Sequence, residues 1–356
     1  MRIHQLLASL EFGDAVAGLA LAIQRELRRQ GHESEIFAGA RHPLATEPSR
    51  SLGELTGETG ALLIYHHAFW SEGIARALDT FPGRCGMIYH NVTPAHWFAP
   101  WSDELAASAR RARAALGSLR VRMQAVFTES EFNRSELEAA DYQDVGLLPL
   151  ALDLDRLLAI VPEGEVMARH GGSETTFLFV GRLVPNKRQE DVIRVFAWYR
   201  RFIDPACRLV LVGAAPEIDA YRADLVEVAR ACRVEDAVVF AGKVSPAELA
   251  AYYRVADVFL CMSEHEGFGV PLVEAMAFGV PVVARGAAAV PETLGDAGVL
   301  VGSRAIPEIA EAVALVLRDP VVRAQVLERQ RRRLAAFAPA HFEAGLRRLT
   351  ASLARP

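Results

Sequence analysis

Short runs of apolar residues alternate along this chain with longer stretches in which apolar residues recur every three or four positions. The short runs have the length of β-strands, whereas the longer stretches have the period of amphipathic helices. The runs FLFVG at 177–181 and LVLVG at 209–213 are almost continuously apolar. Strands of this kind are typical of parallel sheets that helices cover on both faces. The pattern therefore predicts an α/β fold.

The alternation of strands and helices occurs in two successive series. In the first series we expect strands at 2–9, 34–39, 61–67, 84–91 and 125–130, with helices at 15–30 and 102–123. In the second we expect strands near 175–183, 207–215 and 236–244, with helices at 188–202, 218–232 and 246–255. The 356 residues suit two domains of roughly 150 residues each. We place the domains at 1–160 and 161–337, and expect 338–356 to form a helix that returns to the first domain.

Composition excludes several classes of protein. The net charge of −5 argues against nucleic acid as a partner. The four cysteines form no C-x-x-C pair, so we expect buried thiols in a reducing compartment. We detect neither a signal peptide nor an apolar run of 18 residues, which together favour a cytoplasmic protein.

The stretch SEHEGFGVPLVEAMAFGVPVV at 263–283 carries the strongest chemical signal. Glu266 and Glu274 stand eight positions apart, with glycines and a proline between them. We expect a strand to end before this loop and a helix to start at Pro271, where proline has a preset φ and no N–H to lose. Free amides at the start of a helix, beside the carboxyl edge of a parallel sheet, form an anion site.

Two cations stand at the corresponding end of another predicted strand. Arg182 and Lys187 follow the apolar run 177–181, and both suit phosphate oxygens. The glutamates would be repelled by phosphate, so we expect them to accept hydrogen bonds from hydroxyl groups on either side of a diphosphate. A diphosphate with hydroxylated groups at both ends is a nucleotide sugar.

The motifs VGRLVPNKRQEDVI and EHEGFGVPLVEAMAFGVPVVA resemble those of the retaining GT-B glycosyltransferases of family 4, with their Glu-x7-Glu motif. The resemblance is specific over residues 177–301 and looser before them. It implies two Rossmann-like domains that face a central cleft, with the nucleotide sugar held mainly by the second domain. It also implies a retaining hexosyltransferase, needing no metal and no other cofactor, that acts in polysaccharide or glycoconjugate biosynthesis.

The resemblance also implies roles for particular residues. Arg182 and Lys187 would hold the diphosphate, Glu266 would contact sugar hydroxyls and Glu274 would bind the ribose. With His90 at a strand end near the transferred sugar, the catalytic candidates are His90, Arg182, Lys187 and Glu266. The donor-binding candidates are Gly13, Asp14, Gly181, Lys243, Val244, Gly267, Phe268, Gly269, Val270 and Glu274. The weaker acceptor-binding candidates are Asn91, Trp97, Ser130 and Asn133.

Several of these residues have a structural alternative. Asp14 suits the N-cap of the first helix as well as it suits a donor contact. His90 and the aromatic residues after it could equally belong to the core. Asp153 and Asp155 imitate an Asp-x-Asp metal motif, but they lie in the segment between the domains, and we interpret them as structural.

A basic helix in the first half is a second open question. It carries Arg110, Arg111, Arg113, Arg120 and Arg122. Such a helix is a candidate for peripheral contact with the anionic inner face of a membrane. A solvated face is the alternative.

We therefore predict an enzyme that moves a hexose from a nucleotide diphosphate sugar to a hydroxyl group of a glycan or glycolipid acceptor. Two alternatives are a nucleotide-sugar 2-epimerase of the same architecture and a non-catalytic binder of nucleotide sugars. A dinucleotide dehydrogenase is disfavoured because G-x-G-x-x-G does not follow the first predicted strand.

Overall fold

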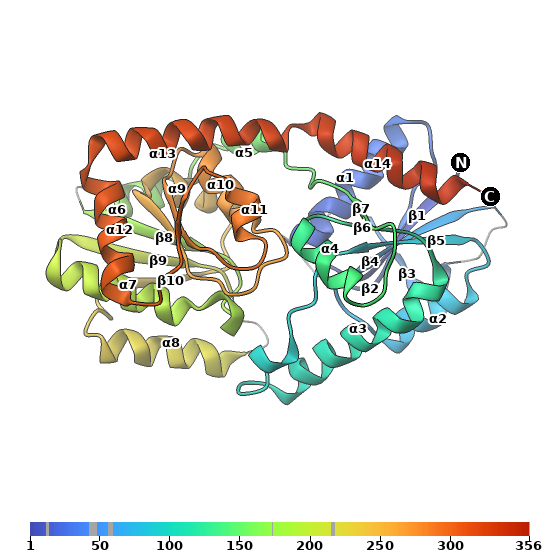
Figure 1. Cartoon of the computed structure of the whole chain (residues 1–356), viewed down its shortest axis with the longest axis horizontal. Helices are drawn as coiled ribbons and strands as arrows, with labels where there is room; N and C mark the ends of the chain where they lie inside the picture. The colour runs from blue at the N-terminus through green and yellow to red at the C-terminus, as the bar shows by residue number, and fades with distance from the viewer. Residues whose placement is uncertain (12–13, 43–47, 56–59, 173, 215–217, 356) are drawn as a thin grey trace. The chain divides into compact units, whose positions relative to one another are not determined.

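The chain folds into two compact units. The computed structural model describes residues 1–11, 14–42, 48–55, 60–172, 174–214 and 218–355. Unit 1 comprises Met1–Ala99, Asp103–Leu152 and Phe337–Pro356, and unit 2 comprises Pro100–Ser102 and Asp153–Ala336. Each unit has a parallel sheet in its middle with helices on both faces (Figure 1), which confirms the α/β fold.

The described part of unit 1 contains a seven-stranded sheet in the order β3-β2-β1-β4-β5-β6-β7, and neighbouring strands are parallel. The strands are β1 Ile3–Leu10, β2 Ile36–Arg41, β3 Arg50–Ser51, β4 Leu62–His67, β5 Arg84–Tyr89, β6 Met123–Thr128 and β7 Gly146–Leu147. The helices are α1 Ala15–Arg29, α2 Glu72–Thr80, α3 Asp103–Arg122, α4 Glu131–Glu138 and α14 Pro339–Ala354, with 3-10 turns at Leu52–Glu54 and Ala95–Trp97. The chain reverses its direction of travel across the sheet between β1 and β4, which makes this a switch point.

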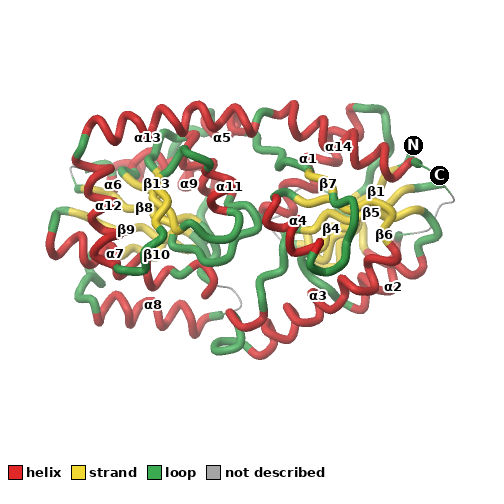
Figure 2. Tube along the Cα trace, in the orientation of Figure 1, coloured by secondary structure: helices red, strands yellow, loops and turns green. Residues whose placement is uncertain are grey.

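The described part of unit 2 contains a six-stranded parallel sheet in the order β10-β9-β8-β11-β12-β13, with its switch point between β8 and β11 (Figure 2). The strands are β8 Thr175–Val180, β9 Cys207–Val212, β10 Val238–Gly242, β11 Val258–Cys261, β12 Val282–Arg285 and β13 Val299–Val301. The helices are α5 Leu154–Leu158, α6 Gly164–His170, α7 Gln189–Phe202, α8 Asp219–Ala231, α9 Pro246–Val255, α10 Val270–Ala277, α11 Val290–Leu294, α12 Ile306–Arg318 and α13 Pro320–Arg333. The 3-10 turn Pro185–Lys187 belongs to this unit, and Leu334–Phe337 leads out of it.

A side-chain cap fixes the start of α9. Ser245 accepts a hydrogen bond from the amide of Glu248 while the Glu248 carboxylate accepts one from the amide of Ser245, which forms a capping box at the start of α9. The predicted helix at 246–255 is observed at Pro246–Val255, and that at 188–202 at Gln189–Phe202. Part of the core of unit 2 lies between α7 and the sheet, where the ring of Phe177 packs 4.9 Å from that of Tyr199 and 5.5 Å from that of Phe196.

The last helix, α14, packs on the sheet of unit 1, as predicted (Figure 1). Its buried side includes Leu346, Leu349 and Leu353, all fully buried. A Cβ atom on Gly86 of β5 would lie 2.9 Å from a methyl carbon of Leu353, so the missing side chain at Gly86 lets the helix approach the sheet. The returning helix therefore supplies part of the hydrophobic core of unit 1.

Three of the cysteines, Cys85, Cys207 and Cys261, are buried free thiols, while Cys232 is half-buried and also free. Burial raises the pKa of the Cys85 thiol to about 11 and that of Cys261 to about 11. Among the described residues, no helix combines the length and the apolar character needed to cross a bilayer.

At the carboxyl edge of the second sheet, two backbone segments lie too close for side chains. Gly213 follows β9 with a φ of 144°, and a Cβ atom there would lie 1.8 Å from the carbonyl oxygen of Gly181. The amide of Gly213 also donates to the carbonyl of Gly242 at 2.8 Å. Glycine at 213 is therefore required by the packing of the strand ends that surround the switch point.

We expect Gly213→Ala to destabilise the protein by at least about 2 kcal/mol, because the added methyl group must displace backbone at a positive φ. Urea unfolding measures the change. Gly117→Ala is the control, since Gly117 is exposed in the middle of α3 with open space around it. That control should be more stable than wild type by up to about 1 kcal/mol, and equal effects of the two substitutions would contradict the interpretation.

Candidate functional site

The loop after β8 carries the predicted cations. Gly181 follows the strand with a φ of 152°, and Arg182 comes next with an exposed side chain. The chain then forms the 3-10 turn Pro185–Lys187 before α7 begins. The backbone carbonyl of Arg182 accepts a hydrogen bond at 2.8 Å from Gln189 in the first turn of α7. The loop is thus anchored at the carboxyl edge of the sheet, next to the switch point.

The glycine-rich loop after β11 has the predicted form. Gly269 is the N-cap of α10 with a φ of 94°, and Pro271 lies in the first turn of this helix. A Cβ atom on Gly269 would lie 2.8 Å from a methyl carbon of Leu272, so both the conformation and the space require glycine. Because β8 and β11 are neighbours in the sheet, this loop and the loop that carries Lys187 flank the same switch point.

Lys187 and Glu266 form an ion pair across the two loops. The side chain of Glu266 is 10% exposed and that of Lys187 is 20% exposed. The pair is therefore largely withdrawn from water, where each charge needs the other. A ligand that binds here meets a lysine already held in place by a carboxylate, and a carboxylate that can also accept hydrogen bonds from hydroxyl groups.

Backbone contacts hold the same two loops together. The side-chain amide of Asn186 donates to the carbonyl of His265 at 2.8 Å, and the amide of Glu264 donates to the carbonyl of Asn186 at 2.9 Å. On the other side, the amide of Ala289 donates to the carbonyl of Glu266 at 3.2 Å, and the hydroxyl of Thr293 donates to the carbonyl of Phe268. The loop that carries Glu266, Gly267 and Phe268 is therefore fixed from both sides.

Glu274 lies in α10 and is held by a tyrosine from a different helix. The hydroxyl of Tyr253, in α9, donates to the Glu274 carboxylate at 2.7 Å. Tyr253 is fully buried, and its ring stacks on that of Phe278 with centroids 5.1 Å apart. Burial raises the pKa of Glu274, and the hydrogen bond from Tyr253 opposes that rise. Sequence reasoning missed Tyr253, because the run AYYRV at 251–255 shows only a helix with two aromatic residues.

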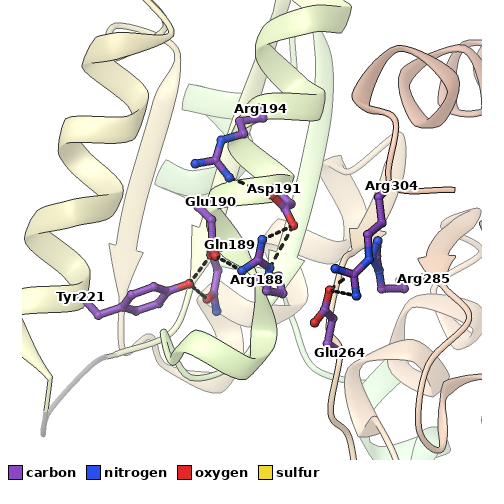
Figure 3. A network of polar contacts seen from close by, with 9 residues as sticks. All are labelled: Arg188, Gln189, Glu190, Asp191, Arg194, Tyr221, Glu264, Arg285 and Arg304. Atoms are coloured by element: carbon purple, nitrogen blue, oxygen red, sulfur yellow. Dashed lines mark hydrogen bonds and ion pairs between the residues drawn. The ribbon is translucent and has the colours of Figure 1, made fainter. Parts of the chain in front are cut away.

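A charged network surrounds the two loops, and sequence reasoning also missed it (Figure 3). Glu264, two residues before Glu266, pairs with Arg285 at 3.4 Å and with Arg304 at 3.1 Å. Arg188 has a left-handed φ of 54° and pairs with Glu190 and Asp191, each at 2.8 Å. The hydroxyl of Tyr221 donates to Glu190 at 2.6 Å. These contacts neutralise Glu264 and fix the first turn of α7 directly after Lys187.

The remaining donor-binding candidates of unit 2 lie along the same edge of the sheet. Val270 is the first residue of α10, and Lys243 and Val244 follow β10. Lys243 is exposed and Val244 is half-buried. The structure thus places Arg182, Lys187, Glu266 and the glycine-rich loop around the switch point, with Glu274 one turn into α10.

In unit 1, the structure places two of the acceptor-binding candidates, Asn91 and Asn133, close to the pair formed by His90 and Glu129. The imidazole of His90 contacts the carboxylate of Glu129 and lies 2.8 Å from the imidazole of His66. Asn91, with a φ of 73°, donates to the side-chain oxygen of Asn133 at 2.8 Å. Sequence reasoning had not singled out Glu129 or His66, although each stands at the end of a strand that was predicted.

Several candidates have local structural roles. Asp14 caps α1 by accepting from the amides of Val16 and Ala17 at 3.2 and 3.4 Å, which is the alternative left open by the sequence. Ser130 caps α4 by accepting from the amide of Asn133 at 3.1 Å. Trp97 lies in the 3-10 turn Ala95–Trp97 and is half-buried. Gly13 lies outside the described residues.

The Asp-x-Asp segment and the basic helix α3 also have structural partners. Asp153 caps α5 by accepting from the amide of Arg156 at 3.1 Å. In α3, Arg113 pairs with Glu136 at 2.8 Å, and Arg122 donates to the carbonyl of Phe81 at 2.7 Å. Arg120 pairs with Asp141 at 3.2 Å. Within the described ranges, no group of three or more His, Cys, Asp or Glu side chains could hold a metal ion.

Residues 168–334 match the family model described as glycosyl transferases, group 1. This region includes Arg182, Lys187, Glu266 and Glu274, and it is nearly all of unit 2. The second half of the chain is thus similar to glycosyl transferases of group 1.

Curated relatives match over part of their length. A GDP-mannose-dependent alpha-(1-6)-phosphatidylinositol monomannoside mannosyltransferase from Mycobacterium tuberculosis is 33% identical over 203 residues, covering 53% of this chain and 51% of the relative. An N-acetyl-alpha-D-glucosaminyl L-malate synthase from Bacillus anthracis is 32% identical over 161 residues, covering 45% of this chain and 40% of the relative. The chain thus spans about half the length of the curated relatives it matches, or less.

Solved structures match over nearly the whole chain. A sucrose-phosphate synthase from Thermosynechococcus elongatus has a TM-score of 0.75 at 19% identity and covers 99% of both chains. The Anabaena protein HepE, solved in complex with UDP-glucose, has a TM-score of 0.74 at 17% identity and covers 99% of this chain and 100% of its own. At these identities the likeness concerns the fold, and it confirms the predicted GT-B class of two Rossmann-like domains.

The partly buried ion pair makes a testable contribution to stability. We expect Lys187→Met to destabilise unit 2 by about 2 kcal/mol or more in urea unfolding, since it leaves Glu266 with little water and without its cation. Adding Glu266→Gln to Lys187→Met should recover part of the loss, with a coupling energy of about 1 kcal/mol. Arg331→Ala is the control, because its pair with Glu328 is exposed, and it should change stability by less than about 1 kcal/mol. Additive effects of the two site substitutions would contradict the pairing.

Proposed function

We propose that this protein is a glycosyltransferase that moves a hexose from a nucleotide diphosphate sugar to an acceptor hydroxyl. The proposal rests mainly on one observation. Lys187 and Glu266, joined as an ion pair, lie beside the glycine-rich start of α10 at the switch point of a parallel sheet, within the region that matches group 1 glycosyl transferases. Ligands of open α/β sheets bind at such switch points.

The chemistry of these groups suits a donor with two phosphates. Transfer breaks the bond between the sugar and the phosphate, and negative charge grows on the leaving diphosphate. The ammonium group of Lys187, the guanidinium of Arg182 and the first amides of α10 can stabilise that charge where it develops. Glu266 holds Lys187 in position and can accept hydrogen bonds from sugar hydroxyls, while Glu274 can do the same for the ribose.

Retention of configuration and independence of metal ions are the finer parts of the proposal. The resemblance of the two motifs to retaining family 4 enzymes supports retention. Lys187, which Glu266 holds in place, and Arg182 supply positive charge that a divalent metal would otherwise provide, which supports a metal-free reaction. The anomeric configuration of the product, measured by NMR, tests retention, and turnover in the presence of EDTA tests the need for a metal.

The donor base, the sugar and the acceptor are open to experiment. One relative is named for GDP-mannose and a phosphatidylinositol mannoside, and a protein of the same fold binds UDP-glucose. A thermal-shift screen with UDP, GDP and dTDP sugars should single out the donor, because a ligand at 100 times its dissociation constant adds about 2.7 kcal/mol of stability. We propose a glycan or glycolipid acceptor in glycoconjugate biosynthesis.

The relatives favour transfer over the two alternatives. Three of the relatives that match the chain are named as a mannosyltransferase, an N-acetyl-alpha-D-glucosaminyl L-malate synthase and a D-inositol 3-phosphate glycosyltransferase. An epimerase would convert the donor without an acceptor, whereas a binder would leave it unchanged. Analysis of the products with and without acceptor separates the three activities.

Loss of either cation should slow transfer. We expect Lys187→Ala and Arg182→Ala each to lower kcat by on the order of 10²-fold, by analogy with the removal of one donor that stabilises charge in a transition state. Release of the nucleoside diphosphate, followed with saturating donor and acceptor, measures the effect.

Arg194→Ala is the matched control for these two variants. Arg194 lies in the second turn of α7 and pairs with Asp191 at 2.9 Å. Its side chain is 43% exposed. This variant should keep near-normal turnover. If the Lys187→Ala, Arg182→Ala double variant also kept near-normal turnover while folded, the roles assigned to the two cations would be wrong.

The Tyr253–Glu274 contact predicts a dependence on pH. Burial raises the pKa of Glu274, so protonation at mildly acidic pH should remove an acceptor for the ribose and weaken nucleotide binding. The free energy of unfolding depends on pH in the opposite direction. A raised pKa of Glu274 stabilises the folded protein at pH values below the pKa of the unfolded chain, about 4.3, and this contribution is lost as the pH rises through the pKa of the folded state.

Tyr253→Phe removes the hydrogen bond that lowers the pKa of Glu274. We therefore expect nucleotide binding by this variant to weaken at a higher pH than binding by wild type. Calorimetric titration of the identified nucleoside diphosphate between pH 5 and pH 8 measures both profiles. Tyr142→Phe, which removes a buried hydroxyl in unit 1, should leave the profile unchanged. Coincident profiles for Tyr253→Phe and wild type would exclude the role of this contact.

A further inference from the structure

Four polar side chains form a hydrogen-bonded row across the sheet in unit 1, and three of them stand at its carboxyl edge. Gln5 lies in β1, His66 in β4, His90 directly after β5 and Glu129 directly after β6, and these strands are neighbours in the order β1-β4-β5-β6. Gln5 is fully buried and His66 is 1% exposed, and the side chains of His90 and Glu129 are 4% exposed. The row therefore lies out of reach of bulk water.

The contacts along the row are specific. The amide nitrogen of Gln5 donates to the carbonyl of Ala20 in α1 at 2.9 Å, and its oxygen lies 2.9 Å from Nε2 of His66. Nδ1 of His66 lies 2.8 Å from Nε2 of His90, with nearly parallel rings whose centroids are 5.0 Å apart, so the rings meet edge to edge. Nδ1 of His90 contacts the Glu129 carboxylate.

When its groups have their ordinary charges at neutral pH, this row has one proton too few to fill all of its hydrogen bonds. It has four links, and each link needs one hydrogen. Both ends, the carbonyl of Ala20 and the ionised carboxylate of Glu129, can only accept. The Gln5 amide can fill one link, and each neutral imidazole can fill one more. Three donors for four links leave two acceptors facing each other, which is costly in a buried site.

The direction of the row decides where the missing proton is needed. Because Gln5 donates to Ala20, its oxygen must accept from Nε2–H of His66. Burial lowers the pKa of His66 well below its usual value, so His66 keeps only this one proton and its Nδ1 accepts. His90 must then donate through Nε2 to His66, and it faces the Glu129 carboxylate with its other nitrogen.

We propose that His90 carries protons on both ring nitrogens at neutral pH, as an imidazolium paired with the Glu129 carboxylate, and that Gln5, His66 and Glu129 are positioning residues that hold it in this form. The other oxygen of Glu129 accepts from the side-chain amide of Asn133 at 3.3 Å, which suits an ionised carboxylate. The proposal deepens the proposed function, since His90 is one of its catalytic candidates.

The charged and titratable groups around the pair come from β4 and from two further elements, α3 and α4. His67, at the end of β4, is neutral because burial lowers its pKa to about 4. Glu136 of α4 is paired with Arg113 of α3 at 2.8 Å. The side-chain amide of Asn91 donates to Glu136 and to Asn133, each at 2.8 Å. The second carboxylate of this region thus has its own cation, and Glu129 is the one that faces His90.

This protonation state constrains the chemistry of His90. A general base needs a nitrogen lone pair, and an imidazolium has none to offer. In this form His90 acts as a fixed positive ring beside a carboxylate and takes no proton from an acceptor. Proton removal from the acceptor hydroxyl must then use another group, such as the leaving phosphate.

Nitrogen-15 NMR of the full chain with labelled histidine tests the proposal directly. At pH 7 we expect His66 to show one protonated nitrogen and one nitrogen with a free lone pair. We expect both nitrogens of His90 to be protonated. Assignment uses His66→Gln and His90→Gln. A lone-pair nitrogen on His90 of the wild-type protein at pH 7 would overturn the proposal, whether or not any variant folds.

Glu129→Gln adds a second readout, because it removes the charge that balances the imidazolium. We expect His90 in this variant to lose one proton at pH 7 and to gain a lone-pair resonance. Glu138→Gln, on the exposed side of α4, should leave the spectrum of His90 unchanged. An unchanged His90 in a folded Glu129→Gln protein would also count against the proposal.

Turnover separates this proposal from the proposed function. If the protein transfers sugar, Glu129→Gln should lower kcat with little change in KM for the donor, because the ring is misoriented while the donor site in unit 2 is intact. If transfer is absent in the wild type but His90 is doubly protonated, the transferase proposal fails and the present inference stands.

Discussion

The protein has two parallel sheets, and helices cover both faces of each. Polar side chains on these strands are therefore buried unless they stand at a strand end. The strands β8 and β11 are almost wholly buried, and so are β4 and β5. Polar chemistry therefore gathers where the strands stop, and parallel strands stop along one edge. This constraint brings Lys187 to Glu266 in one sheet and His90 to Glu129 in the other, although each pair is far apart in the sequence.

The same burial decides how the acids are held. Glu266 is paired with a lysine, Glu129 with a histidine, and Glu274 receives a tyrosine hydroxyl. A carboxylate taken out of water needs such a partner, because an unpaired buried charge is far costlier than an exposed one. These contacts place the acids before any ligand arrives, and positioning of this kind lowers the cost of binding and of charge development.

The sequence was most informative where one residue type satisfies a strict local requirement. Gly269 and Pro271 fix the start of α10 through a positive φ and a preset φ, so the conformation of the glycine-rich loop could be predicted. The polar partners Tyr253, Arg285 and Glu129 could not be predicted in the same way. Each lies on a different element from the residue that it holds, and its local sequence is that of an ordinary helix or strand.

By itself the sequence determined the α/β alternation, the two domains, the returning helix and the residues of the glycine-rich loop, because periodicity and backbone restrictions act over a few neighbouring positions. Only the tertiary structure decided that Lys187 is bound to Glu266, that Asp14 caps α1, and that His90 has both ring nitrogens engaged within unit 1. Those outcomes depend on the strand order, which sets neighbours between segments that lie tens of residues apart, and on burial, which makes each polar atom require a partner.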